Sequence, residues 1–362
     1  MDQARSLPTL PRSEQSTQST FWIRLRSWEY WPAWLTNLPV IGFWLYHGLK
    51  AQHPFFFSAA NPAIETGGVL GESKSKILDQ VPAHLKPQTL FLDSGISGPE
   101  GLQQIQVSGL QFPIVAKPDV GERGLGVEKI DTSDLWLAYR KQVDVPILVQ
   151  EYVDFQEEYS VLYVRLPGES KGKITSLCHK IHLQVRGNGI DTLEDLIKSH
   201  PRALLKWEQL AIKWKEELKR IPVKGEKVVL VPIGNHARGA MFLNANDQID
   251  EGLLSTFDQL HEQLEGIYLC RYDLKCTSLD DLKAGKNFKI LEINGVLGEP
   301  AHIYDPNYSV KQAYRDLFTH WTHVYEVAKA VHQSQGIPYL GFKEALKALF
   351  QHLAYLRKFP KL

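Results

Sequence analysis

The chain of 362 residues has no excess of charge of either sign, since 41 Lys and Arg residues balance 41 Asp and Glu residues. Nucleic-acid-binding proteins usually carry a clear basic excess, so this balance argues against that class. Cysteine is scarce as well. Cys178, Cys270 and Cys276 lack the close paired spacing of a zinc site. So few thiols are typical of reduced, structural cysteines, and we expect a cytoplasmic protein.

Long hydrophobic runs are also missing. The most apolar stretch, residues 31–46, is interrupted by Pro32, Pro39 and Gly42, and it is shorter than the roughly 20 residues that a membrane-spanning helix needs. The first apolar cluster begins only at Phe21 and no short basic segment leads into it, so we expect no signal peptide. Residues 1–20 are rich in Ser, Thr, Gln and Pro, which predicts a disordered tail.

Tryptophan is abundant in one segment, because five of the nine tryptophans fall within residues 21–57. We expect this segment to form a helical hairpin that packs on the main body and buries its tryptophans. Trp and Tyr also favour membrane interfaces, and Arg24, Arg26 and Lys50 flank the patch, so contact with a membrane surface or a partner is the alternative. With the polar and Gly-rich linker that follows, the segment spans residues 21–85.

Short runs with the residue types of strands dominate from residue 112 onward. They cover residues 112–117, 125–130, 147–152, 159–165, 172–181, 228–233, 270–276 and 288–293. Helical patterns begin after Thr192 and cover residues 203–218, 310–333 and 341–357, of which the last is basic and amphipathic. This order predicts a mixed α+β fold without the strict alternation of a doubly wound sheet.

A predicted strand ends at Lys117 and continues into a loop that contains Gly121, Gly124 and Gly126. Glycines let backbone N–H groups approach phosphate oxygens, and the lysine adds a point charge. The loop lacks the Gly-Lys-Ser/Thr of a Walker motif. Taken alone, it suits a hairpin turn as well as a phosphate-binding loop.

The extended segment 148–153 offers backbone groups that can pair with the edge of a purine, and Glu158 follows it. A carboxylate can accept hydrogen bonds from ribose hydroxyls. By itself, this pattern is explained equally well by a solvated acidic turn.

Arg271 and Asp273 lie two residues apart in a predicted strand, as do Glu292 and Asn294 in the next one. Because residues i and i+2 of a strand face the same side, each pair points together. Oxygen ligands of these types suit Mg²⁺, which completes its shell with water and phosphates. The alternative is a structural network of Arg with Asp and Glu with Asn. The sequence also contains isolated basic residues, namely Lys74, Lys180, Arg165 and Arg186. Each of them alone is more often a surface charge than a ligand contact, so they are candidates only in combination with these motifs.

With these motifs in chain order, residues 70–310 resemble the ATP-grasp superfamily, above all ligases of the D-alanine–D-alanine ligase type that join a carboxylate to an amine. Residues 185–197 and Asn235 to Gly239 are similar to segments of cyanophycin synthetases and bifunctional glutathione synthetases. Two features depart from the family. No N-terminal Rossmann-like substrate domain is evident, and residues 295–302 lack the Ser-Pro-Gly run of dipeptide ligases, so the identity of the substrates does not transfer.

The resemblance implies a role for each matched residue. ATP would be bound by Lys74, Lys117, Gly121, Gly124, Gly126, Gln150, Glu151, Tyr152, Val153 and Glu158, with Lys76 as a second match for the first lysine. Asp273, Glu292 and Asn294 would bind Mg²⁺, two ions by family precedent, with Mn²⁺ as a substitute. Arg271 and Lys180 would be catalytic. Position alone adds a set of candidates for the substrate pocket, namely Arg165, Arg186, Arg202, His236, Arg238, Glu299 and His302.

The resemblance also implies an ATP-grasp fold, in which two α+β subdomains hold ATP between them. We expect a small lid subdomain over residues 86–165, a large subdomain over residues 166–335 and a basic amphipathic C-terminal helix over residues 336–362. The expected activity is an ATP-dependent carboxylate–amine ligase with an amino acid or peptide among its substrates. A small-molecule kinase of the same fold and a non-catalytic nucleotide-binding or membrane-docking protein are the alternatives. The sequence leaves a homodimer open.

Overall fold

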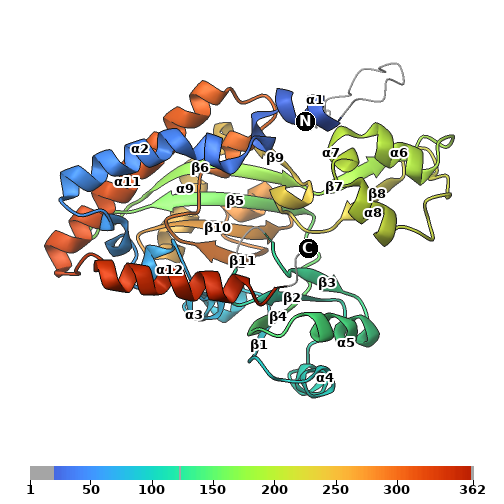
Figure 1. The fold of residues 1–362 in the computed structure, drawn as a ribbon, viewed down its shortest axis with the longest axis horizontal. Helices are drawn as coiled ribbons and strands as arrows, with labels where there is room; N and C mark the ends of the chain where they lie inside the picture. Colours follow the sequence, from blue (N-terminus) through green and yellow to red (C-terminus); the bar gives the residue numbers. More distant parts are fainter. Residues whose placement is uncertain (1–19, 122–123, 360–362) are drawn as a thin grey trace. The chain divides into compact units, whose positions relative to one another are not determined.

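The computed structural model describes residues 20–121 and 124–359. These residues form two compact units. One contains the described residues up to Pro32 together with Leu183–Val231, and the other contains the rest. Both combine helices and strands, which confirms the α+β class (Figure 1). Apart from residue 20, the predicted disordered tail lies outside the described residues. The subdomain boundaries at residues 86, 166 and 336 stay predictions.

The larger unit is built around a five-stranded antiparallel sheet with the strand order β11-β10-β5-β6-β9. Its strands are β5 (Glu157–Val164), β6 (Lys173–Ile181), β9 (Met241–Asn244), β10 (Leu269–Cys276) and β11 (Phe288–Asn294). Helices α9 (Glu251–His261) and α10 (Leu279–Lys283) belong to this unit, and Phe257 of α9 packs on Tyr272 of β10 with 5.1 Å between the ring centroids. This face of the sheet therefore forms the apolar core, which leaves the opposite face for polar side chains.

A second antiparallel sheet in this unit has the order β1-β4-β2-β3, with β1 (Thr89–Leu92), β2 (Ile114–Pro118), β3 (Glu128–Ile130) and β4 (Ile147–Glu151). Helices α4 (Gly98–Val107) and α5 (Ser133–Gln142) accompany it, and the fully buried Trp136 donates from Nε1 to the carbonyl of Gly98 at 2.8 Å. Strand β3 is shorter than the predicted 125–130, because Gly126 has φ +68° and cannot be extended.

Helix α2 (Ala33–Ala51) packs on the long helix α11 (Val310–Gln335), beside the five-stranded sheet (Figure 1). The rings of Phe43 and Phe318 lie 4.7 Å apart, and the hydroxyl of Tyr314 donates to the carbonyl of Thr36 at 3.1 Å. Helix α11 begins at a Ser309 cap and ends at Gly336, whose φ is +68°. It is followed by α12 (Phe342–Leu356), which matches the predicted C-terminal helix.

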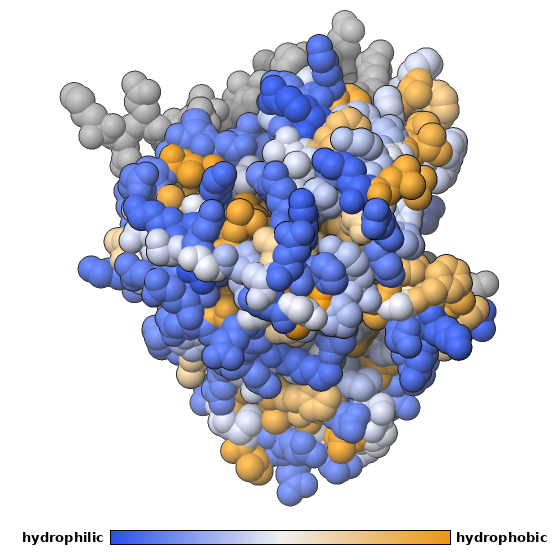
Figure 2. Space-filling view, turned by 90° about the vertical axis from the view of Figure 1, so that its left-hand side faces the viewer, coloured by the Kyte–Doolittle hydropathy of each residue, from blue (hydrophilic) through white to orange (hydrophobic). Residues whose placement is uncertain are grey.

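The expected hairpin with buried tryptophans is wrong in two respects. Helix α1 (Thr20–Arg26) belongs to the smaller unit and α2 to the larger one. Trp22 and Trp34 expose more than half of their surface, because they lie on the outer sides of α1 and α2. Figure 2 shows one face of the molecule, on which hydrophobic groups lie among hydrophilic ones. No described helix combines the length and the apolar composition needed to cross a membrane.

The smaller unit contains the two-stranded sheet of β7 (Leu183–Arg186) and β8 (Lys227–Val231). Helix α6 (Leu193–Ser199) begins, as predicted, after Thr192, whose side chain and that of Asp195 form a capping box. The single helix predicted over 203–218 is instead α7 (Pro201–Leu204) and α8 (Trp207–Lys213), because Lys206 between them leaves the helical conformation.

The described residues of the two units also form short 3-10 helices: η1 (Trp28–Tyr30), η2 (Phe56–Ala59), η3 (Glu65–Gly67), η4 (Ala83–Leu85), η5 (His236–Arg238), η6 (Asn246–Gln248) and η7 (Ala301–Tyr304).

Candidate active site

The polar face of the five-stranded sheet carries the predicted metal and catalytic residues. In the register of β10 and β11, Arg271 lies opposite Asn294 and Asp273 lies opposite Glu292. The expected pairing of side chains two residues apart is confirmed, since Nε and Nη2 of Arg271 donate to the two carboxylate oxygens of Asp273 at 3.3 Å each. Four candidate side chains from two strands therefore share one face of the sheet.

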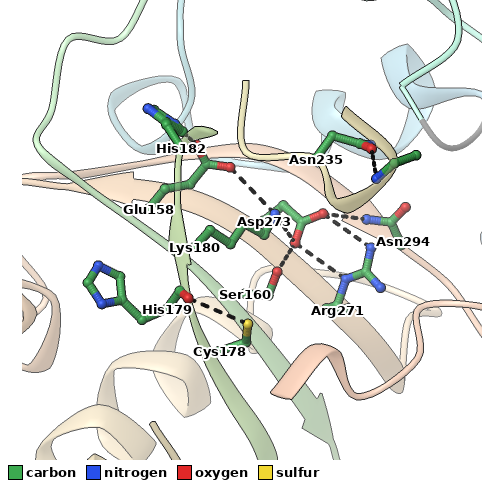
Figure 3. Close-up of polar contacts among 11 residues, drawn as sticks. Glu158, Ser160, Cys178, His179, Lys180, His182, Asn235, Arg271, Asp273 and Asn294 are labelled. Carbon is green, nitrogen blue, oxygen red and sulfur yellow. Dashed lines mark hydrogen bonds and ion pairs between the residues drawn. The ribbon is translucent and has the colours of Figure 1, made fainter. Parts of the chain in front are cut away.

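Asp273 is the centre of this group (Figure 3). Its carboxylate lies 3.0 Å from Nζ of Lys180, accepts a hydrogen bond from Nδ2 of Asn294 at 3.2 Å, and accepts another from the hydroxyl of Ser160. Burial alone would raise the pKa of Asp273, but Arg271 and Lys180 hold it well below its usual range. Asp273 is consequently ionised and surrounded by donors.

Glu158, the predicted ribose carboxylate, lies on the neighbouring strand β5. Its Oε1 is 3.5 Å from Nζ of Lys180, and its Oε2 is 3.0 Å from Nε2 of His182 (Figure 3). Burial opposes ionisation, yet Lys180 and His182 lower the pKa of Glu158 below its ordinary value. Gly234 lies against this carboxylate and leaves no room there for a Cβ atom. The structure thus holds Glu158 as a buried carboxylate in a fixed position.

Two further lysines lie on the same side of the site. Nζ of Lys117, at the end of β2, donates to the carbonyl of Leu291 at 2.7 Å, and burial lowers its pKa to about 8. Lys74 begins α3 (Lys74–Asp79) and is buried, and its Nζ donates to the carbonyl of Gly121 at 2.5 Å and lies 3.7 Å from Glu292. Lys76 is exposed and pairs with Glu65 at 2.6 Å, so Lys74 is the lysine that reaches the site.

The glycine loop follows β2, and two of its residues, 122 and 123, lie outside the described residues. Gly124 and Gly126 have φ values of +73° and +68°, which other residues rarely adopt. Their carbonyls are held by the protein, since Nη2 of Arg238 donates to Gly124 and the hydroxyl of Tyr139 donates to Gly126, both at 2.9 Å. The loop is therefore tied to the segment that contains Arg238.

The predicted adenine-binding segment, Gln150 to Val153, spans the end of β4. The side chain of Gln150 donates to Thr89 at 3.0 Å, and the backbone N–H of Glu151 donates to the carbonyl of Gln88 at 2.9 Å. Nζ of Lys275 donates to the carbonyl of Val153 at 2.9 Å. Nζ of Lys275 and Nζ of Lys129 each lie 4.8 Å from the ring centroid of Tyr152. Adenine binding by this segment stays a prediction.

The donor set of Asp273, Glu292 and Asn294 fits Mg²⁺ by its chemistry, because all three offer oxygen. The side chain of Glu292 is 27% exposed, and Nζ of Lys74 is its ion-pair partner at 3.7 Å. Nowhere in residues 20–121 and 124–359 do three His, Cys, Asp or Glu side chains form a group able to hold a metal ion. The predicted trio has two carboxylates and one amide, so binding would depend on phosphate oxygens as well.

Sequence reasoning missed Ser160, His182, Lys275 and Glu72. Ser160 and His182 lie two residues beyond Glu158 and Lys180 in the same chain direction, so strand alternation could have found them. Glu72 accepts a hydrogen bond from the N–H of Gly295 at 3.3 Å, and burial raises its pKa to about 7. No motif marks Glu72, because a loop brings it to the site.

The candidates for the substrate pocket have different surroundings. Arg165 donates to the carbonyl of His261 at 3.2 Å, while Arg186 and Arg202 belong to the smaller unit, where Arg202 pairs with Glu29 at 2.7 Å. Nη1 of Arg271 donates to the carbonyl of Glu299 at 3.2 Å. The hydroxyl of Tyr304 donates to the side chain of Glu299 at 3.0 Å. The segment around Glu299 thus borders the catalytic group.

We expect Lys117→Met to weaken ATP binding by about 10- to 100-fold, which corresponds to the loss of one charge-assisted hydrogen bond. The fold should tolerate the change, because burial already disfavours this ammonium group and methionine fills similar space. Calorimetric titration with a non-hydrolysable ATP analogue measures the effect, and Lys76→Met on the exposed neighbour is the matched control. Unchanged affinity in the Lys117 variant would remove this lysine from the site.

The buried His320 of α11 should make the stability of the folded protein depend on pH. Its Nε2 donates to the carbonyl of Val296 at 2.8 Å, and burial lowers its pKa from 6.5 to about 4. Between these values the unfolded chain binds a proton that the folded chain does not, so stability falls as pH decreases from 6.5 toward 4. We expect this group to remove about 2 kcal/mol at pH 5. The free energy of unfolding, measured with urea, should therefore fall less between pH 7 and pH 5 in His320→Gln than in the unchanged protein.

Comparisons with known proteins add the following. No model of a protein family matches the chain. Formate-dependent phosphoribosylglycinamide formyltransferases are similar to part of it: the protein of Cupriavidus taiwanensis is 28% identical over 123 residues, 31% of this chain and 30% of that protein. The protein of Herminiimonas arsenicoxydans is 31% identical over 115 residues, 30% of this chain and 28% of that protein. The chain spans less than a third of the length of these curated relatives.

Solved structures give distant likenesses. A bifunctional glutathione synthetase from Pasteurella multocida matches with a TM-score of 0.35 and 18% identity over 65% of this chain and 34% of that chain. The D-alanine–D-alanine ligase from Bacillus anthracis matches with a TM-score of 0.42 and 14% identity over 73% of this chain and 69% of that chain. The VanG D-Ala:D-Ser ligase from Enterococcus faecalis matches with a TM-score of 0.41 and 12% identity over 71% of this chain and 64% of that chain.

Proposed function

We propose that this protein is an ATP-dependent ligase that joins a carboxylate to an amine and releases ADP and phosphate. One observation carries the proposal. Lys74, Lys117, Lys180 and Arg271 converge on one face of the site with the carboxylates of Asp273 and Glu292. Such a balance of cations and carboxylates suits a triphosphate with its divalent cations.

The reaction has two steps. A substrate carboxylate attacks the γ-phosphate of ATP, which forms an acyl phosphate and releases ADP. The amine then attacks the acyl carbon, so that a C–N bond forms, the C–O bond to phosphate breaks and a proton leaves the nitrogen. The chain contributes mainly by holding the reactants in place and neutralising charge.

The basic residues have separate roles in this scheme. Lys117 and Lys74 screen phosphate charge from the side of the glycine loop, and Lys180 does so from β6. Arg271 stabilises the oxyanion of the tetrahedral intermediate, for which a fixed guanidinium is well suited. Asp273 and Glu299 orient Arg271 by accepting its N–H groups. The loop with Gly121, Gly124 and Gly126 excludes water, which would hydrolyse the acyl phosphate.

Asp273, Glu292 and Asn294 would hold Mg²⁺, with Mn²⁺ as a substitute and two ions by family precedent. The ions would neutralise charge on the β- and γ-phosphates. Glu158 would accept the ribose hydroxyls, and the segment from Gln150 to Val153 would pair with adenine through backbone groups.

A screen for ADP release tests the proposal. The protein is incubated with ATP and Mg²⁺ against pairs of amino acids, peptides and small carboxylates, and positive reactions are analysed by mass spectrometry. A new amide together with ADP and phosphate is the expected result. A phosphorylated metabolite would instead identify a kinase of this fold, and ATP binding without any product would identify a non-catalytic nucleotide-binding protein. A homodimer and a cytoplasmic location stay predictions.

A further inference from the structure

The outer face of α2 is apolar and exposed. Six of its side chains, Trp34, Leu35, Leu38, Ile41, Leu45 and Leu49, expose between 42% and 80% of their surface. Positions 34, 38, 41 and 45 repeat at intervals of four and three, which places them along one side of the helix. The inner side is occupied, since His47 stacks on Tyr325 at 4.8 Å and Phe43 contacts Phe318. Apolar patches of this extent commonly mark an interaction surface.

Helix α12 repeats this pattern in the same unit. Phe342, Leu346, Leu349, Phe350 and Leu353 form a stripe whose members expose between 38% and 65% of their surface. Beside the stripe lie Lys343 and Lys347, and the helix is followed by Arg357 and Lys358. Both helices lie at the outside of the unit in Figure 1.

The structure holds both ends of α12 in place. Near its start, the ring of Phe342 lies 6.0 Å from that of Phe55, and the N–H of Leu340 donates to the hydroxyl of Ser58 at 2.8 Å. Beyond its end, Phe359 is buried in the core of the four-stranded sheet, with Tyr355 packed against the same core. The helix cannot turn to bury its stripe without breaking these contacts, so the apolar side stays outward.

The charge of the two helices indicates which kind of partner would cover their apolar faces. Residues 33–51 and 342–358 contain five Lys and Arg residues and one acidic residue, Glu344, although the whole chain has no net charge. No Asp or Glu occurs anywhere from residue 30 to residue 64. Two copies of this chain meeting through these faces would bring like charges together, whereas an anionic surface would complement them.

We propose that the outer faces of α2 and α12 dock this protein on an anionic phospholipid membrane. Each helix would lie in the plane of the interface, with its apolar stripe among the acyl chains and its lysines at the head groups. Trp34 and Tyr46 add the aromatic side chains that interfaces favour. Phe359, three residues beyond the end of α12, is buried in the core of the four-stranded sheet that carries Lys117, which links the docking surface to the proposed catalytic site. The docking surface does not depend on the proposed ligase activity.

Vesicle sedimentation of the full chain tests this inference. One set of vesicles contains phosphatidylcholine alone and the other contains phosphatidylcholine with phosphatidylserine. The variants are Leu38→Glu/Leu45→Glu in α2 and Leu346→Glu/Phe350→Glu in α12. Val107→Glu at the end of α4, where the side chain is 83% exposed, is the matched control. All are surface changes, so thermal melts should be unchanged, and single substitutions replace any double variant that does not melt cooperatively.

We expect the unchanged protein and the Val107 variant to sediment with the anionic vesicles, more weakly at high salt, and little with the neutral ones. Each double variant should bind at least about tenfold more weakly. Failure of the unchanged protein to sediment, or binding by both double variants equal to that of the control, would overturn the proposal. A dimer in analytical ultracentrifugation that the double variants dissociate would also overturn it in favour of a second copy. ADP release measured on the same variants keeps this result separate from the fate of the proposed reaction.

Discussion

Asp273→Asn is expected to remove both turnover and much of the stability of the larger unit. Asp273 is 13% exposed and neutralises Lys180, which is buried, and Arg271, whose side chain is 22% exposed. An asparagine of the same shape removes the one carboxylate that both cations share. Breaking a buried ion pair by removing one partner costs about 3–5 kcal/mol, and a typical domain has only about 5–15 kcal/mol in total.

Urea unfolding and ADP release measure the two effects. Asp79→Asn is the matched control, since Asp79 faces Lys86 at 3.8 Å with 82% of its side chain exposed. A surface pair of this kind contributes about 0–1 kcal/mol, so the control should stay within that range and keep full activity. If Asp273→Asn were as stable as the control, Lys180 and Arg271 would have to be neutralised by groups other than Asp273.

Glu292→Gln is expected to separate catalysis from stability. Glu292 lies opposite Asp273 in the sheet, but its side chain is 27% exposed and its cation partner Lys74 is 3.7 Å away. Because Nζ of Lys74 also donates to the carbonyl of Gly121 at 2.5 Å, the unfolding free energy should change less than in Asp273→Asn. Turnover should fall on the order of 10²- to 10³-fold, because an amide is a poorer Mg²⁺ ligand than a carboxylate and the phosphate charge is no longer balanced.

The measurements are the dependence of ADP release on Mg²⁺ concentration and a thermal melt of the same preparation. Glu344→Gln, an exposed change in α12, serves as the control. A shift of the half-saturating Mg²⁺ concentration to higher values in the Glu292 variant would support its role as a metal ligand. Near-normal activity with an unchanged dependence on Mg²⁺ would exclude Glu292 from the site.

Local sequence patterns were sufficient for the elements that carry the site. Alternation along β10 and β11 predicted that Arg271 would point with Asp273, because the side-chain period of a strand is two residues. Helix α6 was predicted from its Thr192 cap, since a capping box satisfies backbone groups within a few residues. The same approach failed where tertiary contacts decide, as in the single helix expected over 203–218, which is split so that Trp207 and Trp214 can pack on the small core of their unit.

The sequence by itself determined the α+β class, most of the strands and the identity of the charged residues, because each of these depends on local periodicity and composition. Only the tertiary structure decided which lysine enters the site. Lys74 and Lys76 are two residues apart with the same chemistry, yet one is buried beside Gly121 and the other pairs with Glu65 at the surface. Only the tertiary structure, likewise, added Glu72 to the site and left the outer faces of α2 and α12 uncovered. Burial and long-range contacts fix these outcomes, and no spacing within the chain encodes them.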